Sequence, residues 1–188
     1  MEQFKRFRPE FRPEVARDSR SPANFISLID AIQYCRWLSE RESISKDQMC
    51  YPPESEIALQ HAVLAEAARI KTGYRLLTRA EWEYACRAGS TTPWFCGDIE
   101  QQMEEFAWFA KNSRGHLQPV GRLMPNPFGL FDIVGNVTER CHAPSSDPTG
   151  VCGGSYNDLR LRSDEWQHLS NTGYSFTGFR IVRTVPRN

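Results

Sequence analysis

Residues 73–85 read GYRLLTRAEWEYA, and this stretch decides the fold more than any other part of the sequence. Thr78 and Glu81 have the spacing of a capping box, in which a hydroxyl oxygen and a carboxylate satisfy free N–H groups at a helix start. This pattern predicts a helix that runs from Thr78 through Ala88 and is ended by Gly89. The four residues before Thr78 are expected to form a short strand.

Three more helices are expected on the N-terminal side of this stretch. The first is short and lies within residues 1–7. A second begins at Ser27, where Asp30 completes another capping box, and ends near Glu42 after a run of apolar residues at helical spacing. Residues 56–70 are rich in alanine, which favours a third helix there.

The C-terminal half of the sequence lacks the helical periodicity of the N-terminal half. After Gly89 no long helical period occurs, and short apolar segments alternate with Gly, Pro and Asn. This pattern predicts loops and short strands packed on the helices, which gives an α+β domain with a high loop content. We expect residues 1–24 to form an N-terminal helix and connector, and residues 25–188 to form the main domain.

The charge balance narrows the choice of partners. The chain of 188 residues carries 23 basic and 23 acidic residues, so its net charge is zero. A nucleic-acid-binding surface would show as a basic excess, so no nucleic-acid partner is expected. No apolar run of about 18 residues occurs, which argues against a membrane span. The charged N-terminus lacks the apolar run of a secretion signal, so we expect a cytoplasmic protein with reduced thiols.

Six cysteines are spread along the chain without a CxxC pair, which makes a zinc site unexpected. They are Cys35, Cys50, Cys86, Cys96, Cys141 and Cys152. Cys141 and Cys152 lie at the two ends of a short loop, so a disulfide between these two remains open.

Five ordered motifs carry a resemblance to a known family. Besides residues 73–85, they are DA and YCRWL within 30–38, NPFGLFDIVGNV at 126–137, GGSY at 153–156, and RS with GFR between 162 and 180. With these motifs the chain resembles the formylglycine-generating-enzyme (sulfatase-modifying factor) family. The resemblance implies a C-type-lectin-like fold, in which two or three helices surround short, twisted antiparallel sheets. The residues that occupy these motifs are similar to those of kinase-associated members and of the variable proteins of diversity-generating retroelements.

The resemblance also shows what this chain lacks. Working enzymes of the family bind copper(I) through two cysteines, two and seven positions after the aromatic residue of the GGSY motif. Asp158 and Ser163 stand at these positions here, and neither supplies the soft thiolate that copper(I) needs. Copper is therefore unexpected, and the sequence favours a protein without enzymatic activity. Oxidation through other groups (Cys141, Cys152 or His142) or through non-haem iron remains an alternative.

A calcium site is a second implication of the resemblance. The family holds a calcium ion at the turn that contains GNV, and the corresponding ligands are the Asp132 side chain, the Gly135 and Val137 carbonyls, and the Glu139 carboxylate. Calcium takes several oxygen ligands of these kinds. The alternative is a tight turn whose two acids cap backbone N–H groups.

Residues 157–177 are the candidate ligand-binding segment. They mix aromatic residues with Arg, His and Asn without a clean period, which suits a recognition loop on a rigid scaffold. The resemblance to retroelement variable proteins implies that this stretch forms the binding face. The candidate residues are Asn157, Asp158, Arg160, Arg162, Asp164, Trp166, His168, Asn171, Tyr174 and Phe176. The alternative is an irregular loop whose aromatic residues pack on the core.

Three functions remain open from the sequence. The first is a non-catalytic module that recognises a protein or peptide ligand through residues 157–177. The second is an oxidoreductase of the sulfatase-modifying type. The third is a regulatory domain of a bacterial kinase-linked system. The sequence leaves the identity of the ligand and the oligomeric state open.

Overall fold

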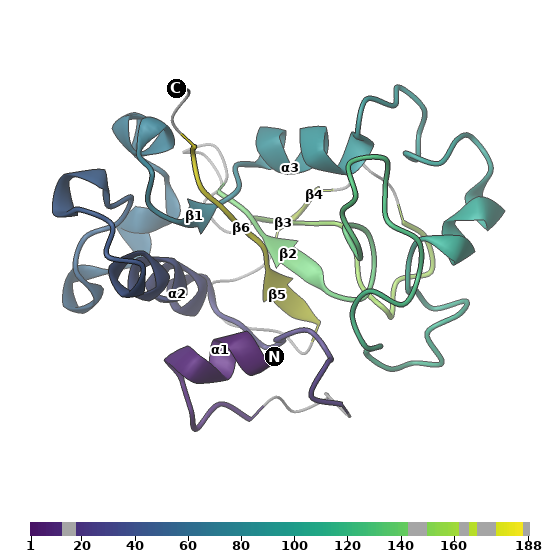
Figure 1. The fold of residues 1–188 in the computed structure, drawn as a ribbon. Helices are drawn as coiled ribbons and strands as arrows, with labels where there is room; N and C mark the ends of the chain where they lie inside the picture. Colours follow the sequence, from purple (N-terminus) through teal and green to yellow (C-terminus); the bar gives the residue numbers. More distant parts are fainter. Residues whose placement is uncertain (13–17, 143–149, 162–165, 169–175, 186–188) are drawn as a thin grey trace.

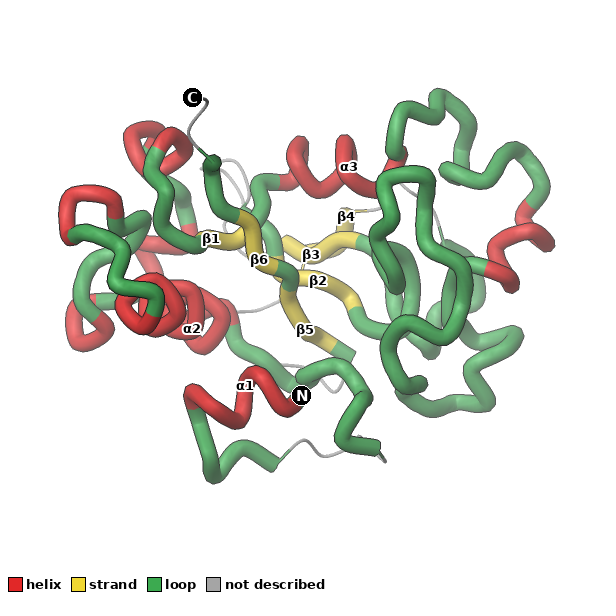
Figure 2. Tube along the Cα trace, viewed as in Figure 1, coloured by secondary structure: helices red, strands yellow, loops and turns green. Residues whose placement is uncertain are grey.

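The computed structural model describes residues 1–12, 18–142, 150–161, 166–168 and 176–185. Within these ranges, three α-helices and several short 3-10 helices surround two small sheets at the centre of the molecule (Figures 1 and 2). The expected α+β architecture with a high loop content is therefore confirmed. No helix in the described ranges has the length and apolar character needed to cross a membrane.

Six strands in the described ranges form the two sheets, and their bounds are β1 (Arg75–Leu76), β2 (Thr138–Arg140), β3 (Gly150–Cys152), β4 (Trp166–His168), β5 (Thr177–Phe179) and β6 (Ile181–Val182). One sheet pairs β1 with β6 in antiparallel fashion, and the other has the order β4-β3-β2-β5. In the larger sheet β2–β3 and β3–β4 are antiparallel, whereas β2 and β5 are parallel.

The parallel pair corrects the expectation of purely antiparallel sheets. Thr138 lies opposite Thr177 in this pair, and β3 and β4 lie between them in the sequence. A connection of this length allows a strand to return in the same direction as its neighbour, which a short hairpin cannot do. The pairing places β5 and the start of β6 beside the turn that precedes β2.

The three α-helices begin where the sequence predicts them. They are α1 (Glu2–Phe7), α2 (Leu28–Arg41) and α3 (Arg79–Arg87). Both capping boxes are present: the Ser27 side chain accepts from the Asp30 N–H, and the Thr78 side chain accepts from the Glu81 N–H. At the end of α3, Ala88 already adopts the left-handed conformation with φ of 49°, one residue before the expected Gly89.

The prediction of a helix over residues 56–70 is wrong. The structure has three 3-10 helices in this region instead, η2 (Glu54–Glu56), η3 (Leu59–Ala62) and η4 (Glu66–Ile70). Ala68 is buried, and Ile57 and Leu64 pack against the cluster at α2, but Val63 and Ile70 are 37% and 79% exposed, so only part of the described apolar surface of this segment contacts the core. Helices in proteins depend on such packing more than on alanine content, because propensity alone contributes little. Two further 3-10 helices are η1 (Lys46–Gln48) and η5 (Glu100–Glu105).

The core has two main clusters, one beside each long helix. The cluster at α2 includes Phe4 from α1, whose ring stacks on Tyr34 at 5.6 Å and meets Phe179 of β5 edge-on at 5.9 Å. The cluster at α3 is built around Trp82 and includes Phe109. Residues 1–12 therefore share a core with the main body, and α1 lies against α2 and β5 (Figure 1).

Candidate functional site

The turn before β2 is held in place by tight backbone contacts. Asp132, Gly135 and Asn136 all have positive φ angles, of 51°, 80° and 60°. The Asn136 N–H donates to the Trp108 carbonyl at 2.7 Å, and a Cβ atom at position 135 would lie 2.4 Å from that same oxygen. Glycine is therefore required at position 135, because any side chain would collide with backbone. The turn leads directly into β2, where Glu139 faces Arg180, and the Asp132 side chain contacts the loop at Gly121.

Glu139 lies on β2 and is bound by two side chains. Arg180, between β5 and β6, makes an ion pair of 2.8 Å from Nη2 to Oε1, and its Nε lies 3.1 Å from Oε2. The indole Nε1 of Trp82 donates to the same Oε2 at 2.8 Å. Burial lowers the pKa of Arg180, but the carboxylate of Glu139 outweighs this effect and raises the pKa, so the guanidinium stays charged.

Asp132 is held on one side only. Its Oδ2 accepts from the Gly121 N–H at 2.7 Å, and no described residue donates to its other carboxylate oxygen. Burial raises the pKa of Asp132, and the negative charge of Glu139 adds to this, while the Gly121 N–H and Arg180 act in the opposite direction. The protein therefore pays a free-energy penalty to keep this carboxylate ionised.

In this arrangement, the oxygen atoms of the predicted calcium ligands are not all free to bind an ion. Arg180 Nη2 donates to Glu139 and to the Phe131 carbonyl at 3.0 Å, and it lies 3.5 Å from the Asp132 carbonyl. A guanidinium thus occupies the position between these oxygens, and Glu139 could bind calcium only if Arg180 moved away. Gly135 and Val137 lie in the same turn as expected. Calcium binding stays a prediction.

A cavity of about 560 Å³ opens beside this charged cluster. Its apolar walls come from α1, α2, β5 and the loops of residues 120–131. Asp132, Glu139 and Arg180 are the charged side chains that line it, beside the polar Gln3 and Asn136. Pockets that bind small molecules have volumes of this order and the same combination of apolar walls with a few polar groups. Sequence reasoning missed this cavity and also gave Arg180 no role, although the GFR motif at 178–180 marked the residue.

Asp158, which stands at the first thiolate position of the working enzymes, has a structural role in this chain. Asp158 Oδ2 accepts from the Ser155 N–H at 2.6 Å and from the Ser155 hydroxyl at 2.9 Å. Its backbone carbonyl accepts from the Ala110 N–H at 3.0 Å. Asp158 therefore closes a turn and is fixed by its neighbours. Ser163, at the second position, lies outside the described residues.

The remaining thiols offer no substitute pair of thiolates. All six cysteines are free, and Cys141, directly after β2, and Cys152, at the end of β3, are both buried. Burial raises the pKa of Cys141 well above its usual value, and the contact with Cys152 raises it further. A thiol that stays protonated is a poor ligand for a soft metal. In the described ranges, no three His, Cys, Asp or Glu side chains gather closely enough to hold a metal ion.

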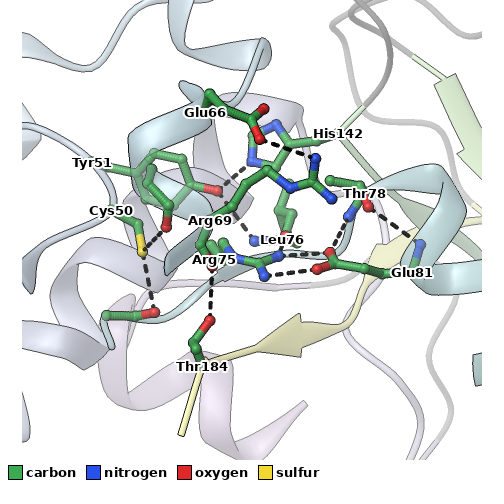
Figure 3. A network of polar contacts seen from close by, with 12 residues as sticks. Cys50, Tyr51, Glu66, Arg69, Arg75, Leu76, Thr78, Glu81, His142 and Thr184 are labelled. Atoms are coloured by element: carbon green, nitrogen blue, oxygen red, sulfur yellow. Dashed lines mark hydrogen bonds and ion pairs between the residues drawn. The ribbon is translucent and has the colours of Figure 1, made fainter. Parts of the chain in front are cut away.

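A buried polar network near β1 contains the third candidate group, His142 (Figure 3). The Tyr51 hydroxyl lies 2.5 Å from His142 Nε2 and accepts from the Leu76 N–H at 3.1 Å. Both groups are satisfied when the Tyr51 hydroxyl donates a hydrogen bond to an unprotonated Nε2. Burial raises the pKa of Tyr51 well above its usual value, which keeps that proton in place. His142 is therefore tied into the core.

The same figure shows Arg75 and Glu81 facing each other (Figure 3). Two hydrogen bonds of 2.7 and 2.8 Å join the guanidinium to the carboxylate, which also receives the Thr78 N–H of the capping box. Burial raises the pKa of Glu81, but these hydrogen bonds outweigh it and bring this pKa down to about 2. The network fastens the start of α3 to β1.

The described part of the candidate binding segment is divided between surface and core. Asn157 and Arg160 are exposed, and Asp158 is half-buried in its turn. Phe176 packs against a small cluster that contains Val137, so this aromatic residue serves the core as the alternative expected. The backbones of Trp166 and His168 form part of β4. Arg162, Asp164, Asn171 and Tyr174 lie outside the described residues.

The fold and these positions together define a class of protein. The chain is a C-type-lectin-like domain of the formylglycine-generating-enzyme type, with a carboxylate at the first of the two thiolate positions. It belongs to the family described as the sulfatase-modifying factor enzyme 1-like domain, whose model matches residues 2–185. The family resemblance that the sequence motifs indicated is thereby confirmed.

Two curated relatives and one solved structure illustrate the relationship. The chaperone protein LppX of Paenibacillus barcinonensis is 27% identical over 161 residues, which cover 72% of this chain and 56% of that protein. The formylglycine-generating enzyme of Mycobacterium tuberculosis is 42% identical over 78 residues, covering 36% of this chain and 26% of that protein. The chain thus spans about half the length of the first relative and a quarter of the second.

Treponema denticola variable protein 1 has a similar structure, with a TM-score of 0.71 and 23% sequence identity. The match covers 91% of this chain and 74% of the other. At this level of identity the likeness establishes a shared fold.

Proposed function

We propose that this chain is a non-catalytic recognition module that binds a protein or peptide ligand through the surface of residues 157–177. The observation that carries the proposal is the state of Asp158. Its carboxylate is a hard ligand, is held by two hydrogen bonds from Ser155, and stands where copper(I) chemistry needs a soft thiolate. The scaffold is therefore intact while the oxidising centre is not.

The described surface around Asp158 supports a binding role. Leu159 is 77% exposed, and Asn157 and Arg160 beside it are exposed as well. An apolar side chain and an arginine on a rigid turn provide the kind of anchors that protein interfaces use. The fold shared with a protein described as variable fits the proposal that this chain presents a ligand-specific surface at this position.

An oxidation assay separates this proposal from its enzymatic alternative. The chain is incubated with a cysteine-containing peptide, copper and oxygen, and aldehyde formation is followed by mass spectrometry. A formylglycine-generating enzyme assayed in parallel serves as the positive control. We expect no aldehyde above the rate without protein. Turnover that depends on both copper and oxygen would establish an oxidoreductase and refute the proposal.

A crosslinking experiment tests the binding surface itself. A photoreactive amino acid replaces Leu159, which is 77% exposed, or the control residue Ile70, which is 79% exposed and lies on η4. We expect a discrete crosslinked partner from position 159 and none from position 70. Equal labelling from both positions would show that exposure alone explains the result. A cytoplasmic location and a link to a bacterial kinase remain predictions from the sequence.

A further inference from the structure

A second cavity, of about 240 Å³, forms a groove between α1, the C-terminal half of α2 and β6. None of the described residues that line this α1–α2 groove belongs to 157–177, so it is separate from the proposed recognition surface. Its apolar lining consists of Trp37 and Leu38 of α2, Ile181 of β6 and the ring of Tyr74. Pockets for drug-sized ligands have volumes of about 300–1,000 Å³, so this groove suits a smaller group, about as large as one side chain.

Two arginines of the α1–α2 groove have no acidic partner. Arg6 of α1 and Arg41 of α2 both line the groove, and no carboxylate of the described residues forms an ion pair with either guanidinium. Glu42 is the remaining charged residue of the described lining, and it is already bound. Arg183 Nη1 lies 3.2 Å from its Oε2, and the Tyr74 hydroxyl donates to the same oxygen at 2.9 Å. Arg183 neutralises Glu42, so Arg6 and Arg41 leave the groove with two uncompensated positive charges.

The Tyr34 hydroxyl is an unused hydrogen-bonding group in the same groove. Tyr34 is 7% exposed, and its hydroxyl forms no hydrogen bond with a described residue. Burial raises the pKa of Tyr34, and the positive charges of Arg6 and Arg41 act against this rise, so both guanidiniums lie close to the hydroxyl. The Trp37 ring, whose centroid lies 5.3 Å from the guanidinium carbon of Arg41, holds this arginine in place. The groove thus brings together two charged donors and one neutral donor.

We propose that the α1–α2 groove binds an aromatic phosphate monoester, with the phosphate on Arg6, Arg41 and the Tyr34 hydroxyl and the ring against the apolar lining. A phosphate monoester carries about −1.5 to −2 charges at neutral pH, which matches the two uncompensated guanidiniums. Guanidinium N–H groups form charge-assisted hydrogen bonds with phosphate oxygens, and a tyrosine hydroxyl donates one more. A carboxylate carries a single charge and would leave one arginine uncompensated.

Calorimetric titration of the full chain with phenyl phosphate at low ionic strength tests the proposal. Benzyl alcohol, which has a ring but no charge, and inorganic phosphate, which has the charge but no ring, are the ligand controls. We expect phenyl phosphate to bind at least about tenfold more tightly than either control, which corresponds to about 1.4 kcal/mol. No binding of phenyl phosphate, or equal binding of either control, would overturn the proposal.

Two further ligands sharpen the chemical assignment. Benzoate has a ring and a single negative charge, so it should bind more weakly than phenyl phosphate, and the reverse order would contradict the assignment of a phosphate. A peptide that carries phosphotyrosine is titrated in the same way. Tighter binding of this peptide than of phenyl phosphate supports the site with a protein as the source of the group, and weaker binding supports it with a small molecule as the source.

Arginine variants locate the binding within the molecule. Arg6→Gln and Arg41→Gln each remove one charge at an exposed helical position and keep a good helix former there. We expect each variant to bind phenyl phosphate at least about fivefold more weakly, because a charge-assisted contact is lost. Arg122→Gln, a change at an exposed arginine outside the groove lining, is the control and should bind as the wild type does. Unchanged binding by either groove variant would contradict the proposal.

Tyr34→Phe tests the groove without changing its charge. The ring can keep its contacts with Phe4 and Phe179, and the lost hydroxyl has no partner among the described residues, so the unfolding temperature should stay within about 2 °C of the wild-type value. Phenyl phosphate should bind about threefold more weakly, because one hydrogen bond to the phosphate is lost. A loss of stability with unchanged binding would show that the hydroxyl serves the fold and would overturn its assigned role. The recognition role of residues 157–177 stands independently of all these outcomes.

Discussion

Two charged clusters of this molecule use similar side chains and have opposite properties. The Arg75–Glu81 pair near β1 is closed, because Glu81 receives hydrogen bonds from Arg75 and from the Thr78 backbone, and its pKa falls to about 2. The cluster of Asp132 and Arg180 is open toward a cavity, and burial raises the pKa of Asp132. The direction of a carboxyl pKa thus separates an acid whose ionised form the fold stabilises from one whose ionised form the fold disfavours.

The largest expected effect is the removal of the buried carboxylate in the open cluster. Glu139→Ala leaves Arg180 without its partner and the Trp82 indole N–H without an acceptor. We expect a loss of about 3 kcal/mol or more in the free energy of unfolding, measured by urea denaturation. Glu83→Ala removes a half-buried i,i+4 pair with Arg87 at the surface of α3 and should cost less than about 0.5 kcal/mol. Equal effects of the two changes would mean that Glu139 is not a structural anchor.

The next effect concerns the buried hydroxyl beside the closed cluster. Tyr51→Phe keeps the ring but leaves the Leu76 N–H without an acceptor and removes the donor to His142 Nε2. Unsatisfied buried groups cost about 1–3 kcal/mol, so we expect a destabilisation of that size by thermal or urea unfolding. A change below about 0.3 kcal/mol would show that water or a neighbour replaces the hydroxyl.

Acid titration gives a smaller effect that is specific to Glu81. Its pKa is about 2 in the folded state against 4.5 in the reference state, so its contribution is complete above pH 4.5 and is lost as the pH falls toward 2. We expect the wild type to lose about 1–2 kcal/mol more stability over this range than Glu81→Gln, allowing for partial exposure. Parallel pH profiles of the two proteins would contradict the closed arrangement.

The sign reverses at Asp132, where the effect is smaller still. A carboxyl with a raised folded-state pKa destabilises the protein once the pH rises above that pKa, since the ionised form is disfavoured. Asp132→Asn should therefore raise the free energy of unfolding at pH 7 by less than about 1 kcal/mol, which is seen as a higher unfolding temperature. This gain in stability should vanish in acid. A loss of stability at pH 7 would show that the carboxylate supports the fold.

The open cluster is either a calcium site or a cluster held by the Arg180–Glu139 ion pair. Calcium addition distinguishes these two interpretations, and it has the smallest expected effect on stability. As long as Arg180 stays bound to Glu139, calcium chloride leaves the unfolding temperature within about 1 °C of its value in chelator. A rise of several degrees would mean that the turn of residues 132–139 binds calcium and that Arg180 gives way to it.

The parts of this fold that are encoded locally could be predicted from the sequence. The capping boxes at Ser27 and Thr78 fix the starts of α2 and α3, because each needs only residues three positions apart. The failure over residues 56–70 has a tertiary cause, since alanine content favours a helix but only part of the described apolar surface of this segment contacts the core.

The candidate site depends on contacts between distant residues, and these left no local signal. Glu139 and Arg180 are 41 positions apart, and Trp82 comes from another element 57 positions from Glu139. The motifs marked Asp132, Glu139 and Arg180 separately, but the parallel pairing of β2 with β5 decides that they meet. The cavity likewise needs α1 and β5 to lie together, which composition and spacing do not reveal.

Copper(I) affinity tests the central claim most directly. The reduced chain is titrated against a chromogenic copper(I) chelator under anaerobic conditions, with a formylglycine-generating enzyme as the comparison. We predict that the chain removes no copper from the chelator, because Asp158 closes a turn, the thiols of Cys141 and Cys152 are buried, and burial raises the pKa of Cys141 well above its usual value. Retention of one equivalent of copper(I), abolished by Cys141→Ser or Cys152→Ser, would contradict the claim that this scaffold has no oxidising centre.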